Sequence, residues 1–190
     1  MIMKKTLILI TGPICAGKST LAKLVLNNLA INKMEYISTD LYFKTYFRSN
    51  EGEDSNNYDK AKKYCQYKLN KAIFLQNSFC WETVIAKKDK LETLEKCKKM
   101  GYKILTLFIC VDDFEEIKRR NLKRYNEGWY SVPDIKLKSR YTTMMDNLKQ
   151  LIQLSDEFIA IDSTDGYKII FSAVNGKISI YEKKCNWINI

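Results

Sequence analysis

The sequence contains no histidine, and this absence removes a class of chemistry before any motif is considered. Six cysteines are present, but no two of them have the CxxC spacing of a zinc site. A structural zinc site is therefore not expected, and catalysis by a histidine base is excluded. Cys80 and Cys110 fall inside apolar segments, which predicts reduced, buried thiols and a protein of a reducing compartment, the cytoplasm.

Glycine, proline and long apolar runs are also scarce. Seven glycines and two prolines leave no obvious linker, so a chain of 190 residues predicts one domain, with its main body at residues 1–166 and an appendage at 167–190. No apolar run approaches the roughly twenty residues that a membrane span needs. The N-terminus superficially resembles a signal peptide, but its apolar run is short and leads directly into a glycine-rich motif. We therefore expect no membrane association.

Acidic residues are outnumbered, and the formal net charge is +10. A basic surface can serve nucleic acid, a membrane face or an anionic small substrate. Much of the charge is dispersed lysine, and clusters such as Lys62-Lys63, Lys87-Lys88-Lys90 and Lys98-Lys99 predict solvated helix faces. Nucleic acid stays an alternative partner that the charge alone does not favour.

A glycine-rich segment from Gly12 to Ser19 fits the phosphate-binding loop pattern of two glycines followed by Lys and Ser. An apolar strand, Leu7–Ile10, precedes it, and apolar residues at helical spacing follow it. Lys18 would reach the outer phosphates of a nucleoside triphosphate such as ATP, and the Ser19 hydroxyl would bind Mg²⁺. Thr20 is expected to cap or pack the helix. The residues expected to hold the nucleotide are Gly12, Pro13, Ile14, Cys15, Ala16, Gly17, Lys18, Ser19 and Thr20.

Helical crossovers between apolar strands predict an α/β fold with a five-stranded parallel sheet. The four strands after the first are expected at Met34–Ser38, Ser78–Trp81, Lys103–Val111 and Phe158–Ile161. Ligands of such sheets bind beyond the carboxyl ends of the strands. Acidic residues in these places therefore become candidates for the site.

Asp40 follows the second strand, and two roles stay open for it from the residues alone. It or Thr39 could cap the next helix, or Asp40 could take the proton from an attacking hydroxyl. Glu82 follows the third strand and is our choice for a contact with substrate or with metal-bound water. Asp112 and Asp113 follow an apolar strand, which is the sequence pattern of a carboxylate that positions Mg²⁺. They also precede a helix, which favours a capping role.

Arginines cluster on the helices that flank a short bend with Gly128 and Pro133. One helix begins at Phe114, and the other is expected over Asp134–Leu154 as a single element. Together they predict a lid, residues 119–141, whose guanidinium groups hold phosphate oxygens. Its candidates are Arg119, Arg120, Arg124 and Arg140.

Two further segments are given no chemistry. The aromatic face of Leu41–Arg48 predicts core packing. Alternating residues on both sides of Asn175-Gly176 predict a C-terminal hairpin that pairs with the sheet edge or with itself.

These motifs together resemble the small P-loop kinases of the zeta toxin family. The resemblance covers about residues 5–163 and is most specific at Arg120, Arg124, Gly128, Val132, Pro133, Arg140 and Tyr141. It implies a nucleotide-kinase-like P-loop NTPase fold, a three-layer sandwich with a helical lid. It also implies Asp40 as catalytic base beside Lys18, lid arginines Arg120, Arg124 and Arg140, and Glu82 and Thr83 facing the acceptor. Two residues on the acceptor side depart from the family pattern. They are Trp81 and Tyr130, and many relatives carry His at the position of Tyr130.

The resulting hypothesis is an ATP- and Mg²⁺-dependent kinase that phosphorylates a hydroxyl of an anionic metabolite. The resemblance implies a nucleotide sugar such as UDP-N-acetylglucosamine, and a toxin role would imply a protein antitoxin as partner. A polynucleotide or nucleoside kinase, or an ATP-dependent switch that transfers nothing, are the alternatives. The sequence does not decide the acceptor, the oligomeric state or the role of the hairpin.

Overall fold

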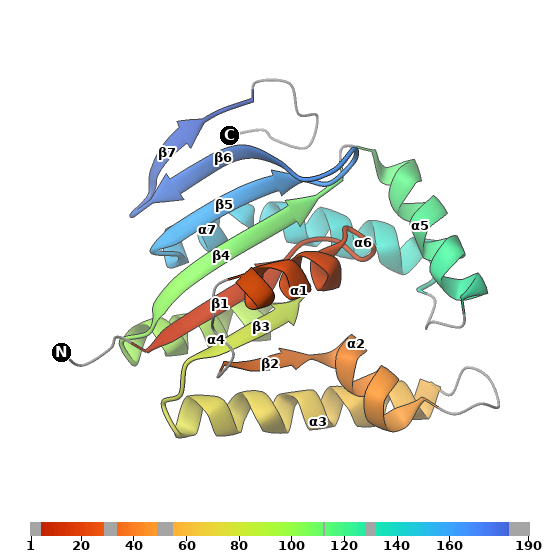
Figure 1. Ribbon diagram of the computed structural model, residues 1–190, viewed down its shortest axis with the longest axis horizontal. Helices are drawn as coiled ribbons and strands as arrows, with labels where there is room; N and C mark the ends of the chain where they lie inside the picture. The colour runs from red at the N-terminus through yellow and green to blue at the C-terminus, as the bar shows by residue number, and fades with distance from the viewer. Residues whose placement is uncertain (1–4, 29–33, 49–54, 112, 128–131, 183–190) are drawn as a thin grey trace.

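The protein folds as a seven-stranded sheet with helices on both faces (Figure 1). The computed structural model describes residues 5–28, 34–48, 55–111, 113–127 and 132–182. The strands are β1 (Thr6–Thr11), β2 (Glu35–Ser38), β3 (Phe79–Thr83), β4 (Lys103–Cys110), β5 (Glu157–Asp162), β6 (Lys168–Val174) and β7 (Lys177–Ile180). The helices are α1 (Lys18–Asn28), α2 (Thr39–Tyr42), the π-helix η1 (Phe43–Phe47), α3 (Ser55–Phe74), α4 (Lys88–Lys99), α5 (Phe114–Asn126), α6 (Asp134–Asp146) and α7 (Leu148–Leu154).

Strand β1 lies in the middle of the parallel part of the sheet. The strand order is β2-β3-β1-β4-β5-β6-β7, and the first five strands are parallel, which confirms the predicted α/β class. Side chains alternate along β1, so Leu7 and Leu9 pack into the larger core cluster with α3, α4 and α7, while Ile8 and Ile10 pack into the smaller one with α1 and α5. Because β1 is buried on both faces, its sequence is a continuous run of apolar residues, Leu7–Ile10.

The C-terminal hairpin extends the sheet by two antiparallel strands. Strand β6 pairs with β5, and β7 pairs with β6, so the hairpin contacts both the sheet edge and itself. Asn175 and Gly176 form the turn with φ angles of 50° and 78°. Both values lie in the left-handed region that such hairpin turns require.

The helix predicted over Asp134–Leu154 is wrong in one respect, because it is two helices. Helix α6 ends at Asp146 and α7 begins at Leu148. The Asn147 side chain between them donates a hydrogen bond to the Ile85 carbonyl at 3.1 Å. This bond ties the break to the loop after β3, and α7 then buries Leu148 and Leu151 in the core.

Of the two roles left open for Asp40, capping of the helix after β2 is wrong, for Asp40 and for Thr39 alike. Ser38 is the N-cap of α2, and its hydroxyl accepts the Leu41 backbone N–H at 3.4 Å. A serine is among the residues that serve this position best, because its side chain reaches the free N–H groups of the first turn. The Asp40 carboxylate is thereby left for other contacts.

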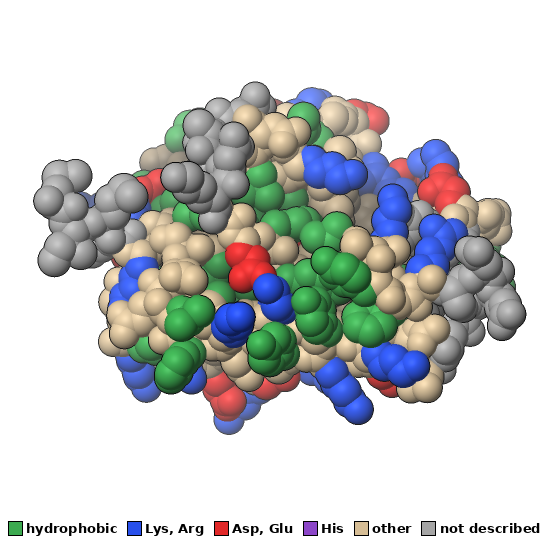
Figure 2. Space-filling view, turned by 60° about the horizontal axis from the view of Figure 1, so that its bottom comes forward, with side chains coloured by type: hydrophobic (Ala, Val, Ile, Leu, Met, Phe, Trp, Pro, Cys, Tyr) green, Lys and Arg blue, Asp and Glu red, His purple; other side chains and the backbone are tan. Residues whose placement is uncertain are grey.

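The aromatic residues of α2 and η1 are only partly in the core. Tyr42 and Phe43 are buried as expected, whereas Tyr46 is 63 % exposed. Figure 2 shows the side of the molecule on which α3 lies. Hydrophobic side chains are exposed there, with Lys and Arg side chains among them. Exposed apolar side chains of α3 include Tyr67 and Phe74. The prediction of core packing for the aromatic face therefore holds for Tyr42, Phe43 and Phe47, and it does not hold for Tyr46.

A glycine capping motif ends α4. Gly101 ends α4 with φ of 82°, and the bonds from Gly101 N–H to Lys98 O and from Tyr102 N–H to Cys97 O form a Schellman motif. Cys80 and Cys110 are fully buried, as expected for residues inside apolar segments. Among the described residues, no helix combines the length and apolarity needed to cross a membrane.

Candidate functional site

The glycine-rich loop connects β1 to α1, and its glycines are needed for steric reasons. Gly12 has φ of 145°, and a Cβ atom there would lie 1.8 Å from the Ile109 carbonyl oxygen of β4. Gly17 has φ of 88°, also unfavourable for other residues. Cys15 adopts φ of 64° without being a glycine. The loop is thus held in a tight conformation against the sheet at the start of α1.

Lys18 is the first residue of α1 and is buried at the mouth of this loop. Its side-chain amine donates to the Pro13 carbonyl at 2.7 Å. Burial lowers the pKa of Lys18, and the negative charges of Glu82 and Asp40 oppose this effect. A buried ammonium group is therefore positioned between the loop and two carboxylates.

Ser19 faces Glu82 of the neighbouring strand β3. The Ser19 hydroxyl donates to Glu82 Oε1 at 2.8 Å, and the Tyr36 hydroxyl of β2 donates to Oε2. Glu82 is only 6 % exposed, and burial together with its charge raises the pKa of Tyr36, so this phenol stays a donor. The structure therefore brings together the residue expected to bind Mg²⁺ and the first choice for its carboxylate partner.

Of the two competing carboxylates, the structure describes Asp113, and it has another place. Asp113 is the N-cap of α5 and accepts the Glu115 backbone N–H at 2.9 Å, which confirms the capping role. Asp112 lies outside the described residues. Between the two candidates that the structure describes, only Glu82 contacts Ser19.

Asp40 has a partner on each carboxylate oxygen. Tyr58 of α3 donates its hydroxyl to Oδ1 at 2.8 Å, and Arg124 of α5 donates from Nη2 to Oδ2 at 3.1 Å. Burial and the charge of Asp40 raise the pKa of Tyr58 well above its ordinary value. Arg124 also directs Nη1 toward the Cys15 sulfur at 3.7 Å. One arginine thus bridges the glycine-rich loop and Asp40.

The other three candidate lid arginines occupy different positions. Arg120 lines the same pocket as the loop, and it donates to Glu116 and to the carbonyls of Ser163 and Thr164. Arg140, on α6, is half-buried and does not line this pocket, but its charge acts on Tyr58. Arg119 is exposed and pairs with Glu116. Gly128 and Tyr130 of the predicted lid lie outside the described residues.

The pocket encloses about 500 Å³ and brings residues from separate parts of the chain to one place. Thr20 is exposed on its wall, where we expected a capping or packing role. Thr83 is absent from the lining, and its hydroxyl accepts a hydrogen bond from Lys90 of α4. The lining residues are Cys15, Gly17, Lys18, Ser19, Thr20, Lys23, Tyr36, Ser38, Asp40, Leu41, Lys44, Glu82, Arg120, Lys123, Arg124 and Glu127.

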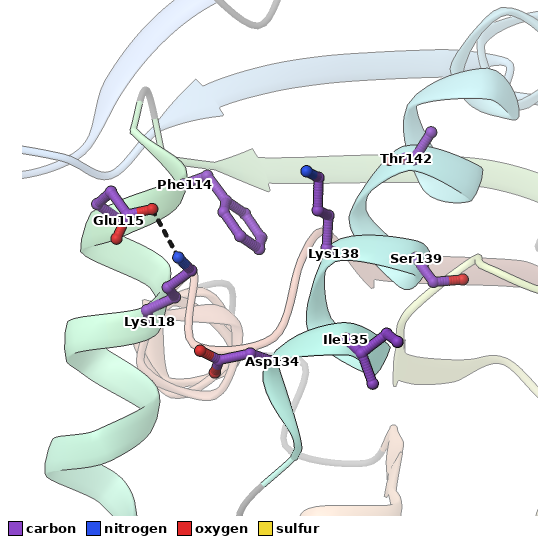
Figure 3. Close-up of a pocket in the computed structure, with 8 residues that line it drawn as sticks. All are labelled: Phe114, Glu115, Lys118, Asp134, Ile135, Lys138, Ser139 and Thr142. Carbon is purple, nitrogen blue, oxygen red and sulfur yellow. Dashed lines mark hydrogen bonds and ion pairs between the residues drawn. The ribbon is translucent and has the colours of Figure 1, made fainter.

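A second pocket of about 490 Å³ lies between α5 and α6 and holds none of the predicted site residues (Figure 3). Lys118 and Lys138 extend into it from facing helices, with Glu115, Asp134 and the ring of Phe114 around them. Lys118 pairs with Glu115 at 2.7 Å. The pocket is open and its charges are mixed, so it offers no clear chemistry.

Sequence reasoning missed Tyr36, which binds Glu82, Tyr58, which binds Asp40, and Lys90, which binds Thr83 outside the pocket lining. Tyr58 lies at the start of a predicted amphipathic helix, and no sequence pattern links it to Asp40. Lys90 belongs to a lysine cluster for which we expected a solvated face, but burial lowers its pKa to about 8. It donates to Thr83 Oγ1 and, at 3.0 Å, to the Val84 carbonyl. The prediction of a solvated cluster is wrong for this one lysine.

Comparison with known proteins supports the fold. The profile of a family described as an AAA domain matches residues 7–151. A search of curated proteins finds no match. The AvrRxo1-ORF1:AvrRxo1-ORF2 complex is similar with a TM-score of 0.70 and 16 % identity over 93 % of this chain and 61 % of that chain. The PezAT toxin–antitoxin system of Streptococcus pneumoniae has a TM-score of 0.67 and 18 % identity over 90 % and 71 %, respectively.

A third structure, the Pnkp1/Rnl/Hen1 RNA repair complex, has a TM-score of 0.55 and 14 % identity over 79 % of this chain and 47 % of that chain. The chain spans about three fifths of the AvrRxo1 chain that it matches. The predicted resemblance to P-loop kinases of the zeta toxin type is confirmed at the level of the fold.

Proposed function

We propose a phosphotransferase function from the premise that this chain belongs to the AAA domain family. In this proposal the protein transfers the γ-phosphate of ATP to a hydroxyl of a small anionic metabolite. The observation that carries it is the shared pocket of Lys18 and Ser19 with Asp40 and Glu82. Transfer to a bound hydroxyl needs a triphosphate site and a carboxylate within reach of it, and this pocket has both.

The donor half of the mechanism rests on the glycine-rich loop. Its backbone N–H groups and the N-terminus of α1 offer positive dipoles for phosphate oxygens. Lys18 would exchange its bond to Pro13 for the outer phosphates. A structure of the AvrRxo1 complex with ATP, which shares the fold at a TM-score of 0.69 and 16 % identity over 93 % of this chain and 60 % of that one, is compatible with this use.

The residues at the loop also fit Mg²⁺. The hydroxyl of Ser19 and the carboxylate of Glu82 are oxygen donors, the class that this ion prefers. Among the described residues no group of three or more Cys, Asp or Glu could hold a metal alone, so the remaining ligands would be phosphate oxygens and water. When bound, the ion would neutralise charge on the transferring phosphate.

The acceptor half rests on Asp40. Its carboxylate would orient the acceptor hydroxyl and take its proton as the phosphate arrives. Tyr58 holds one oxygen of this carboxylate, and Arg124 would turn from Asp40 to the phosphates when both substrates are bound. Arg120 would offer its Nη1 group to the same charge, because its hydrogen bonds to Glu116, Ser163 and Thr164 are made through Nε and Nη2. Closure of these helices would exclude water and limit hydrolysis.

The charge near Asp40 favours an anionic acceptor. Arg124 binds Asp40 directly, and the charge of Arg140 acts on Tyr58, which binds the other oxygen of Asp40. A nucleotide sugar such as UDP-N-acetylglucosamine has the required diphosphate and free hydroxyls, and the zeta toxin-like fold is consistent with it. Thr83, whose hydroxyl accepts from Lys90, has its own proton free to donate toward such an acceptor.

The test is an incubation of the purified protein with γ-labelled ATP, Mg²⁺ and a metabolite extract, followed by mass spectrometry of the products. The proposal expects one metabolite to gain a phosphate. An ATP-dependent switch would release free phosphate only, and that result would remove the kinase assignment.

A polynucleotide kinase is the second candidate, favoured by the net charge of +10 and by the similarity to an RNA repair complex. End-labelling of DNA or RNA with a steep dependence on salt would support it. Indifference to nucleic acid at low salt would remove it.

The similarity to a toxin–antitoxin system motivates a separate proposal about partners. If the chain acts as a toxin, a protein antitoxin would neutralise it, most simply by covering the nucleotide pocket. Competition between a captured partner and ATP would test this arrangement.

A further inference from the structure

We propose that the connection between β5 and β6, residues 163–167, orients the peptide groups of the glycine-rich loop for phosphate binding. Figure 1 shows this connection at the same end of the sheet as the loop before α1 and the start of α5. The inference rests on the proposed use of the loop as a triphosphate site. It assigns a function to the hairpin, a segment to which no chemistry had been given.

Two hydroxyl groups of this connection bind consecutive carbonyl groups of the loop. Ser163 Oγ donates to the Ala16 carbonyl at 2.7 Å and also lies 3.0 Å from the Cys110 carbonyl at the end of β4. Tyr167 donates its hydroxyl to the Gly17 carbonyl at 3.1 Å. Gly17 O also accepts the Leu21 N–H of α1 at 3.0 Å, so both of its acceptor positions are used.

The geometry of the peptide bond turns these carbonyl contacts into control of the N–H groups. In a trans peptide the C=O of one residue and the N–H of the next point in opposite directions. The structure has no cis peptide bond among the described residues. Fixing Ala16 O and Gly17 O on the outer side therefore directs the N–H groups of Gly17 and Lys18 to the inner side, where phosphate oxygens would lie.

The connection is itself rigidly held, which it must be in order to orient anything else. Asp162 Oδ1 accepts the backbone N–H and the hydroxyl of Thr164, at 3.1 and 2.7 Å. Ser163 is buried, with 8 % of its surface exposed. Arg120 donates to the carbonyls of Ser163 and Thr164 at 2.9 and 3.2 Å. The same short segment thus links the loop to an arginine of α5.

Gly17 is fitted to this arrangement. A Cβ atom at Gly17 would lie 3.0 Å from the Tyr167 hydroxyl oxygen, closer than an ordinary contact. The absence of a side chain lets the tyrosine approach the loop backbone. Tyr167 is therefore a positioning residue in this inference, since it acts on the phosphates only through the loop.

The experiment compares Tyr167→Phe with the matched control Tyr181→Phe. Both changes remove one tyrosine hydroxyl from the same hairpin, but the Tyr181 hydroxyl pairs with Ser172 and is remote from the loop. Isothermal titration would measure the dissociation constants of Mg-ATP and of Mg-tripolyphosphate, with the unfolding midpoint of each unliganded variant recorded beside them. Tripolyphosphate reports on the phosphate site without a base or ribose.

We expect Tyr167→Phe to weaken both ligands by a similar factor of about 3 to 10, the range of one uncharged hydrogen bond, and Tyr181→Phe to weaken neither. Ser163→Ala should weaken both ligands as well; because Ser163 is buried, Tyr167→Phe decides the question if Ser163→Ala fails to fold. Unchanged affinities in Tyr167→Phe, even with a lower unfolding midpoint, would overturn the inference. Weakening of ATP alone would also overturn it, because the tyrosine would then act on the base or ribose.

The outcome is separate from that of the proposed function. A wild-type protein that binds neither ligand would contradict the triphosphate site and this inference together. A wild-type protein that binds ATP but phosphorylates nothing would contradict the kinase proposal and leave the comparison of Tyr167→Phe with Tyr181→Phe decisive for the loop.

Discussion

The Ser19 hydroxyl of α1 donates to Glu82 Oε1 of β3 at 2.8 Å, and β3 pairs with β1, the strand that precedes the glycine-rich loop. Replacing Glu82 by Gln keeps the shape but removes the negative charge. We expect kcat to fall by about 100-fold or more and the Mg²⁺ concentration for half-maximal activity to rise, because the carboxylate would orient the metal-water shell. A titration of activity against Mg²⁺ checks this. Activity and Mg²⁺ dependence equal to wild type would assign Glu82 a structural role only.

Lys18→Met should abolish ATP turnover while the fold is retained. The methionine fills the same buried space, so the free energy of unfolding should not fall and should rise slightly, because burial of the ammonium group lowers the pKa of Lys18. Lys62→Met is the matched control, since Lys62 is exposed and pairs with Asp59 on the surface. Turnover assays and urea unfolding of both variants test the prediction. Substantial turnover in Lys18→Met would exclude contact of this lysine with the outer phosphates.

Tyr58→Phe should slow transfer without weakening ATP binding. The change removes the hydrogen bond to Asp40 Oδ1, and a bond to a charged group is worth about 1.5–3 kcal/mol, so kcat should fall by roughly 10-fold or more. Tyr64→Phe on the same helix is the control, because its ring packs between Tyr42 and Tyr46. Steady-state kinetics with separate KM values for ATP and acceptor provide the measurement. A loss confined to the KM for ATP would be inconsistent with a role at Asp40.

We expect the free energy of unfolding to depend on pH through Lys90, and its lowered pKa fixes the sign of this dependence. The folded protein releases this proton near pH 8, whereas the unfolded chain holds it to about pH 10.5. Between these values the unfolded state binds more protons, so the free energy of unfolding rises with pH. Relative to Lys90→Met, the wild type should therefore become more stable from pH 7.5 to about pH 9.5. Urea unfolding of both proteins at several pH values checks this, and a constant difference between them would refute it.

Much of the fold could be predicted because its signals are local. Strand β1, the glycine-rich loop and the start of α1 follow one another within a short segment, and each has a characteristic sequence pattern. The hairpin turn at Asn175-Gly176 was equally clear, since both residues tolerate positive φ. The break at Asn147 was not predicted, because it depends on a hydrogen bond to Ile85, which is 62 residues away.

The site divides in the same way. Residues at strand ends could be found from the sequence, since parallel strands bring Asp40 and Glu82 to one edge. Their partners could not, because Tyr58, Lys90 and Tyr167 act through contacts that only the folded chain creates. A lysine within a charged run gives no sign that it will be buried.

The central claim is transfer to a hydroxyl with Asp40 as the base, and Asp40→Asn tests it most directly. Asn has nearly the shape of Asp and can still accept from Tyr58, so ATP should bind with an affinity within about threefold of wild type. Transfer of labelled phosphate to the acceptor identified in the extract should fall by at least about 100-fold, the usual contribution of a general base. Near wild-type transfer by Asp40→Asn, measured in single turnovers with ATP saturating, would contradict the account.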